Sequence, residues 1–250
     1  ALGFLVGALV LGTAFPFLLK GLGWEISWKT ILWSTSTLAI LGGLAIGFLV
    51  PDGPYRKKSP KLDFGLIPKF TKNTALKGAA GGYFGHMWEL YTFWAFLPAL
   101  IFGLTQGTLS TENQSLWTFW IISAGGVSCA LGGILAQKIG SQQVAIGSLI
   151  LSGLCGLLLL VLPEISAFII FPFLLLWGIS VTADSPQFST LVAQSVPAEQ
   201  RGTALTLVNS VGFGITVISI LVTRELALLF EPKVYLGFLF LGPTVGVFLF

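Results

Sequence analysis

The segment GAAGGYFGHMWELYTFWAFLPALIF, residues 78–102, decides the fold that we expect for this chain. It is predominantly apolar and long enough to cross a bilayer as a helix, yet it carries His86 and Glu89 near its middle. Ionisable side chains are costly inside hydrocarbon, so those that occur there usually pair with one another or serve a function. We therefore predict a membrane-spanning helix whose centre is a functional site.

The composition of the whole chain is that of a membrane protein. Hydrophobic residues make up 54% and charged residues 9% of the sequence, whereas soluble proteins carry roughly 25% charged residues. The hydrophobic runs are about 20 residues long and lack the period-2 alternation of a transmembrane β-barrel. Because helices are the remaining way to satisfy the backbone in lipid, we predict an all-α, multi-pass integral membrane bundle, with the plasma (inner) membrane as its expected location.

Eight apolar runs separated by polar turns predict eight spans. They cover residues 1–19, 30–50, 77–104, 116–136, 142–162, 165–194, 203–222 and 234–250. Seven of the 13 Lys and Arg residues fall between Arg56 and Lys77. We interpret residues 55–76 as a cytoplasmic loop rather than a nucleic-acid contact, because the inner loops of this topology then hold nine basic residues and the outer loops four.

Three ionisable side chains from two spans fall at one depth. His86 and Glu89 lie roughly ten residues beyond Lys77, which at ~1.5 Å per residue is ~15 Å from the inner face. Asp184 lies about ten residues before the inner end of the sixth span. His86 and Glu89 share a helix face because they are three positions apart. Pro186 should distort the sixth span beside Asp184, because proline lacks a backbone N–H.

Each of these residues also has a purely structural explanation. Glu89 could partner a polar group elsewhere in the protein, His86 could be a satisfied packing residue, and Asp184 could bond backbone groups freed by the proline. One His and two carboxylates could bind a metal, but no metal-motif spacing occurs, so we predict no metal and no cofactor. Neither a nucleophile elbow nor a phosphate-binding loop is present, so we do not expect an enzyme.

Two short turns, GILAQKIG at residues 133–140 and PAEQRG at residues 197–202, resemble signatures of the major facilitator superfamily of secondary transporters. Residues 133–140, GILAQKIG, are similar to the family pattern G-x-L-A-D-R-x-G, although Gln137 replaces the usual acid and a lysine replaces the arginine. Residues 197–202, PAEQRG, resemble the family connection P-x-x-x-R-G. The matching positions that we single out are Gly133, Lys138, Gly140, Arg201 and Gly202.

The resemblance implies a fragment that corresponds to helices five to twelve of a twelve-helix bundle. Residues 1–54 would be the last two helices of the N-terminal half, residues 55–76 the cytoplasmic loop between the halves, and residues 77–250 the six-helix C-terminal half. The missing N-terminal helices of the same protein would be its partner. The third and sixth spans would match the seventh and tenth helices, which line the central cavity in this family.

On this basis we expect a secondary active transporter, a symporter or permease that moves a small solute by alternating access. We expect proton or cation coupling through Glu89 and Asp184, with His86 as a relay or substrate contact, because burial disfavours the charged form of a carboxyl group. The cavity wall is predicted to include Trp88, Tyr91, Trp94, Gln187 and Asn209.

Three alternatives remain open at this point. The chain could be an uncoupled facilitator of the same fold, a membrane-embedded enzyme that uses His86 and Glu89 as acid and base, or a scaffold that transports nothing. No Lys or Arg lies deep in a span, which favours a neutral or cationic organic solute over an anion. The expected partners are this solute, protons and the lipid bilayer, and no nucleic acid.

Overall fold

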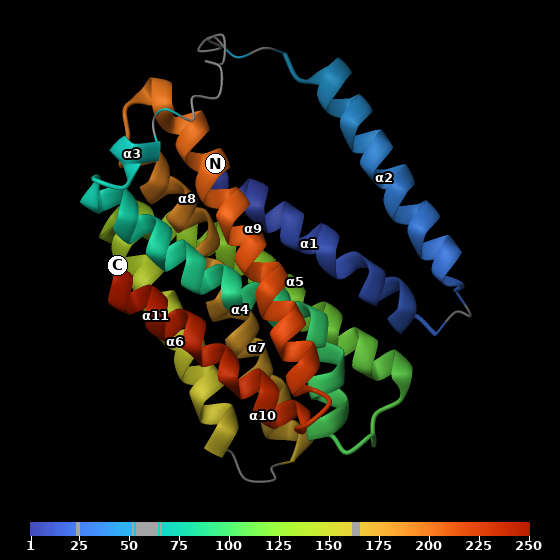
Figure 1. Cartoon of the computed structure of the whole chain (residues 1–250). Helices are drawn as coiled ribbons and strands as arrows, with labels where there is room; N and C mark the ends of the chain where they lie inside the picture. Colours follow the sequence, from blue (N-terminus) through green and yellow to red (C-terminus); the bar gives the residue numbers. More distant parts are fainter. Residues whose placement is uncertain (24–25, 52, 54–64, 66, 162–165) are drawn as a thin grey trace.

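The computed structural model describes residues 1–23, 26–51, 53, 65, 67–161 and 166–250, and this part of the chain is helical (Figure 1). Eight helices or helix pairs in it are long and apolar enough to cross a membrane, which confirms the expected all-α bundle with eight spans. The predicted inner loop at 55–76 lies largely outside the described residues. The helices are α1 (Leu2–Gly21), α2 (Trp28–Leu49), α3 (Ile67–Phe70), α4 (Thr74–Leu104), α5 (Thr111–Ile139), α6 (Ser141–Val161), α7 (Ala167–Ala183), α8 (Ser185–Gln194), α9 (Arg201–Leu226), α10 (Pro232–Gly237) and α11 (Leu241–Leu249), with short 3₁₀ turns at Ala198–Gln200 and Phe238–Phe240.

Helix α4 is the centre of the arrangement, because it packs against α8, α9, α10 and α11 and also touches α5, α6 and α7. It buries apolar side chains in two clusters, one around Phe93 and one around Met87. Helix α1 packs along α5, whereas α2 buries none of its residues and stands apart from the bundle in Figure 1. The predicted functional segment, residues 78–102 of α4, therefore lies at the centre of the bundle.

Glycines let several of these helices approach one another closely. A Cβ atom added at Gly85 of α4 would lie 2.7 Å from the Cα of Gly246 in α11, and one added at Gly242 would lie 2.6 Å from the Gly85 carbonyl oxygen. On the other side of the bundle, Gly7 of α1 meets the backbone of Gly126 in α5. In lipid, where apolar burial gives little drive for association, such close backbone packing supplies much of the attraction between helices.

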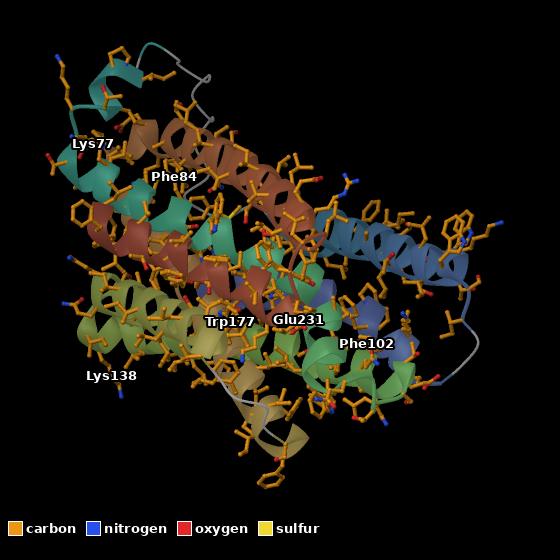
Figure 2. The ribbon with its side chains drawn as sticks, turned by 60° about the horizontal axis from the view of Figure 1, so that its bottom comes forward. Lys77, Phe84, Phe102, Lys138, Trp177 and Glu231 are labelled. Atoms are coloured by element: carbon orange, nitrogen blue, oxygen red, sulfur yellow. The ribbon has the colours of Figure 1, made fainter. Side chains whose placement is uncertain are left out.

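The helix ends follow the polar residues of the sequence. Helix α5 begins at Thr111, earlier than the predicted 116, because the Ser110 hydroxyl accepts a hydrogen bond from the backbone N–H of Asn113 at 3.3 Å. Helix α4 begins at Thr74, where Asn73 accepts from the Leu76 N–H at 3.0 Å. Figure 2 shows Lys77 and Lys138 at the same end of the bundle, as the predicted topology requires of two inner-face lysines.

Asn73 also joins two parts of the bundle, and this gives a testable expectation. Its side-chain Nδ2 donates to the carbonyl oxygen of Ser195, 2.8 Å away at the end of α8. Asn73→Ala removes both the helix cap and this link, so we expect it to lower the free energy of unfolding by about 1–2 kcal/mol. Asn73→Ser keeps a capping oxygen but cannot reach Ser195, so its loss should be smaller. Unfolding in detergent micelles measures both, and equal losses would contradict the double role.

Candidate functional site

The structure brings His86 and Asp184 together in the middle of the bundle. The Nδ1 atom of His86 lies 2.9 Å from Oδ1 of Asp184, and both side chains are completely buried. His86 comes from the middle of α4, and Asp184 is the residue between α7 and α8. The two residues were predicted to share a depth, and the structure shows that they are in contact.

Asp184 sits where the sixth span is interrupted. Pro186, in the first turn of α8, has no N–H to donate backwards. The carbonyl oxygen of Thr182, the acceptor that an unbroken helix would pair with residue 186, receives the thiol of Cys129 at 3.2 Å instead. The helix resumes with the N–H groups of Gln187 and Phe188, which donate to the Asp184 carbonyl oxygen at 2.9 and 3.0 Å. The predicted distortion of this span is therefore confirmed.

Position and surroundings both act on the charge of Asp184. Asp184 is both the C-cap residue of α7 and the N-cap residue of α8, so the negative end of one helix dipole and the positive end of the other act on its charge in opposite directions. Around the pair the neighbours are aromatic, since the ring centroids of Tyr83 and Phe188 lie 6.0 and 6.1 Å from the His86 ring. Among the described residues, none of the four polar atoms of the two side chains makes a well-aligned hydrogen bond, so the 2.9 Å approach of Nδ1 to Oδ1 is an ion-pair contact. Each group of the pair therefore depends on the other.

Glu89 has a different set of partners from the His86/Asp184 pair. Its Oε1 accepts a hydrogen bond from the indole Nε1 of Trp177 in α7 at 2.7 Å, and Ser152 of α6 lies 2.8 Å from its Oε2. All three side chains are fully buried. Figure 2 labels Trp177 in the interior of the bundle, where its ring packs 4.7 Å from that of Phe93. Glu89 therefore joins α4 to α6 and α7.

The partners of Glu89 did not emerge from sequence reasoning. Trp177 and Ser152 lie in the middle of apolar runs, as Glu89 does, and a search for polar atoms at one depth would have found them. Three hydroxyl contacts with α9 were also missed, because Ser and Thr are common in spans of this kind. They run from Thr92 to Ser219 at 2.8 Å, from Ser219 to the Trp88 carbonyl oxygen at 2.6 Å and from Thr216 to the Met87 carbonyl oxygen at 2.8 Å.

The five predicted cavity-wall residues occupy different surroundings. Trp88 borders an apolar cavity of about 220 Å³ between α4, α9 and α10–α11. Tyr91 is half-buried, with its ring 5.3 Å from that of Trp94 and 5.6 Å from that of Phe213 in α9. Gln187 is buried beside Asp184, and Asn209 is half-buried on α9.

The two signature turns lie at helix ends. Gly133 and Lys138 lie in the last turns of α5, and Gly140 ends that helix with a φ of 94°, a left-handed value that suits glycine. A cationic side chain such as Lys138 in a last turn is favourable to the helix dipole. Arg201 and Gly202 open α9 and are exposed. Both turns therefore connect helices at their ends and lie away from the buried polar groups.

Comparison with known proteins agrees with the arrangement of helices and turns. The family model described as Major Facilitator Superfamily matches residues 1–220. No curated protein matches the chain. Members of this family are transporters that carry small solutes across membranes, rather than enzymes. With the match covering most of its length and eight membrane-length helices in its described part, the chain belongs to the Major Facilitator Superfamily of secondary transporters.

Proposed function

We propose that this transporter is driven by a proton gradient and that the His86/Asp184 pair takes up and releases the coupling proton. The observation that carries the proposal is the 2.9 Å contact between two fully buried ionisable groups, made at the break between α7 and α8. The other carboxyl group predicted at this depth, Glu89, has Trp177 and Ser152 as its partners, and the Lys and Arg residues of the described spans lie at helix ends.

Protonation would change how α4 is held to the broken span. With Asp184 ionised and His86 protonated, the pair attracts strongly in a dry environment. A proton lost from His86, or gained by Asp184, removes one charge and leaves the other without its partner, which is costly for a buried group. The α7–α8 junction already lacks one backbone hydrogen bond at Pro186. A change at the pair therefore acts on the weakest point of this helix.

Such a change is what alternating access requires. In this family of mechanisms one bundle rocks against the other around a site near the midplane. We propose that residues 77–250, which include α5 to α11 and all but the first turn of α4, form one such bundle, joined to the preceding half along the crossing of α1 and α5. An uncoupled facilitator would need no titratable pair at this depth. An acid–base enzyme built on His86 and Glu89 is disfavoured, because His86 faces Asp184 while Glu89 faces Trp177 and Ser152.

The solute that fits this proposal is neutral or cationic and organic. No Lys or Arg side chain lies deep in the described spans to hold an anion, and His86 is already paired with Asp184, whereas aromatic and amide groups are available. Tyr91 and Asn209 are half-buried, so they are the candidate contacts for such a solute. Aromatic faces attract organic cations and also pack against sugar or aliphatic surfaces.

The proposal is tested by uptake into proteoliposomes that contain the natural full-length protein. Neutral sugars, polyols, amino acids and quaternary ammonium compounds are offered with an imposed pH gradient, and again after an ionophore collapses it. We expect at least one compound to accumulate above its outside concentration only while the gradient lasts. Equilibration at the same rate with and without the gradient would identify a facilitator and contradict proton coupling.

A further inference from the structure

The carboxyl group of Glu89 has a hydrogen-bond arrangement that depends on whether it carries a proton. We propose that Glu89 stays protonated throughout the transport cycle and, as a neutral acid, fastens α4 to α6 and α7. The proposal about Glu89 rests on the proposed function in one respect, namely that the mobile proton belongs to His86 and Asp184. From the sequence, Glu89 is expected to take part in proton or cation coupling, whereas in this proposal Glu89 keeps its proton and takes no part in coupling.

The number of hydrogens available at Ser152 favours the neutral acid. The Ser152 Oγ lies 2.8 Å from Oε2 of Glu89 and 3.1 Å from the carbonyl oxygen of Leu149, one turn earlier in α6. A hydroxyl group has a single hydrogen, so it can donate to only one of these oxygens at a time. If Glu89 were ionised, both of these oxygens would be pure acceptors and one of the two contacts would lack a hydrogen.

A proton on Glu89 completes the chain of donors. Oε2 then donates to the Ser152 hydroxyl, which passes its own hydrogen to the Leu149 carbonyl oxygen. Oε1 remains an acceptor for Trp177, whose indole N–H can only donate. Each of the three contacts now has one donor and one acceptor. A fully satisfied network of this kind is stabilising in a buried site, whereas a partly satisfied one is costly.

The charges around Glu89 lead to the same conclusion. Among the residues that the structure describes, no Lys, Arg or His side chain lies within ion-pairing distance of Glu89. The titratable neighbours from the packed helices are Asp184 at the α7–α8 junction and the thiol of Cys155 in α6, and neither can supply a positive charge. His86, three residues earlier on α4, is already engaged with Asp184. An ionised Glu89 would be a second buried negative charge without a cation of its own.

A neutral acid has a close substitute, and this makes the proposal testable. In Glu89→Gln the side-chain amide can donate to Ser152 while its oxygen accepts from Trp177, so both hydrogen bonds between α4 and its neighbours are kept. Glu89→Ala removes both contacts and leaves the indole N–H and a hole between three helices. If Glu89 never exchanges its proton, glutamine should also support transport, because nothing in the cycle requires the site to ionise.

The first experiment is infrared difference spectroscopy of the full-length protein in lipid nanodiscs at neutral pH, comparing wild type with Glu89→Gln. We expect the wild type to show the carbonyl stretch of a protonated carboxylic acid that Glu89→Gln lacks. In Ser152→Ala this stretch should move to higher frequency, because the acid loses its hydrogen-bond acceptor. Absence of a protonated-acid band from Glu89, or a band that Ser152→Ala does not move, would overturn the assignment.

Thermal unfolding and uptake of the same variants complete the test. Glu89→Gln should keep the Tm of the wild type, and Glu89→Ala should lower it by roughly 5 °C or more. Gradient-driven accumulation should persist in Glu89→Gln. Loss of accumulation in a folded Glu89→Gln protein would overturn the proposal, because the proton on Glu89 would then be the mobile one. A wild type without gradient-driven uptake would instead refute the proposed function, and the infrared result would still decide the state of Glu89.

Discussion

Asp184→Asn is expected to abolish accumulation of solute against its gradient while leaving the protein folded and able to exchange solute. Asparagine has the size of aspartate and keeps an oxygen that can accept from His86 Nδ1, 2.9 Å away in the native pair. It can neither ionise nor release a proton near physiological pH. A transporter that relies on this site should therefore lose its coupling to the pH gradient, and the solute should reach the same concentration on both sides.

The pH dependence of the exchange rate should also distinguish the wild type from Asp184→Asn. In the wild type, exchange should change with pH as the pair gains and loses its proton, whereas Asp184→Asn should exchange solute at a rate that varies little with pH. Radiolabel exchange in proteoliposomes at equal solute concentrations measures this, because such exchange needs binding and reorientation but no driving force. The matched control is Ser185→Ala, at the half-buried next position of the same junction. Accumulation that persists in Asp184→Asn would contradict the assignment of the coupling proton.

The spans and their order could be predicted from the sequence because lipid imposes a simple rule. Apolar runs of the right length must become helices, and the structure places their ends within a few residues of the predictions. Asp184 and Pro186 also predicted the interruption between α7 and α8, since the effect of proline on a helix is local. The depth shared by Asp184 and His86 followed from counting residues along two helices.

The rotation of each helix about its axis could not be obtained in this way. His86 and Glu89 are three positions apart, and from that spacing they looked like one site on one face. The structure gives them different partners, because α8 approaches His86 while α6 and α7 approach Glu89. Which neighbour meets which side of α4 depends on close helix contacts such as that of Gly85 with α11, and a single sequence does not specify them. The same limit hid Trp177 and Ser152.

Gly85→Leu is expected to be the most destabilising single substitution in the centre of the bundle. A Cβ atom at this position would lie 2.7 Å from the Cα of Gly246 and 2.9 Å from its backbone nitrogen, and a backbone atom cannot turn aside as a side chain can. Helix α11 would have to move away from α4 along their contact. Overpacking of this kind typically costs 1–3 kcal/mol, and we expect about 3 kcal/mol or more here because a whole isobutyl group follows the clashing carbon.

The matched control is Gly147→Leu in α6, where an added Cβ would meet no atom within 4 Å. Both substitutions replace a helical glycine in the same fold, so both gain about 0.8–1 kcal/mol of helix propensity. Gly147→Leu should therefore keep or slightly raise the Tm, and Gly85→Leu should lower it or prevent folding. Size-exclusion chromatography in detergent shows whether each variant elutes as a single species, and thermal unfolding then gives the Tm of each. Similar behaviour of the two variants would mean that α4 and α11 are not in close contact. Because His86 follows Gly85 directly, that result would also remove the basis for the position of His86 against Asp184.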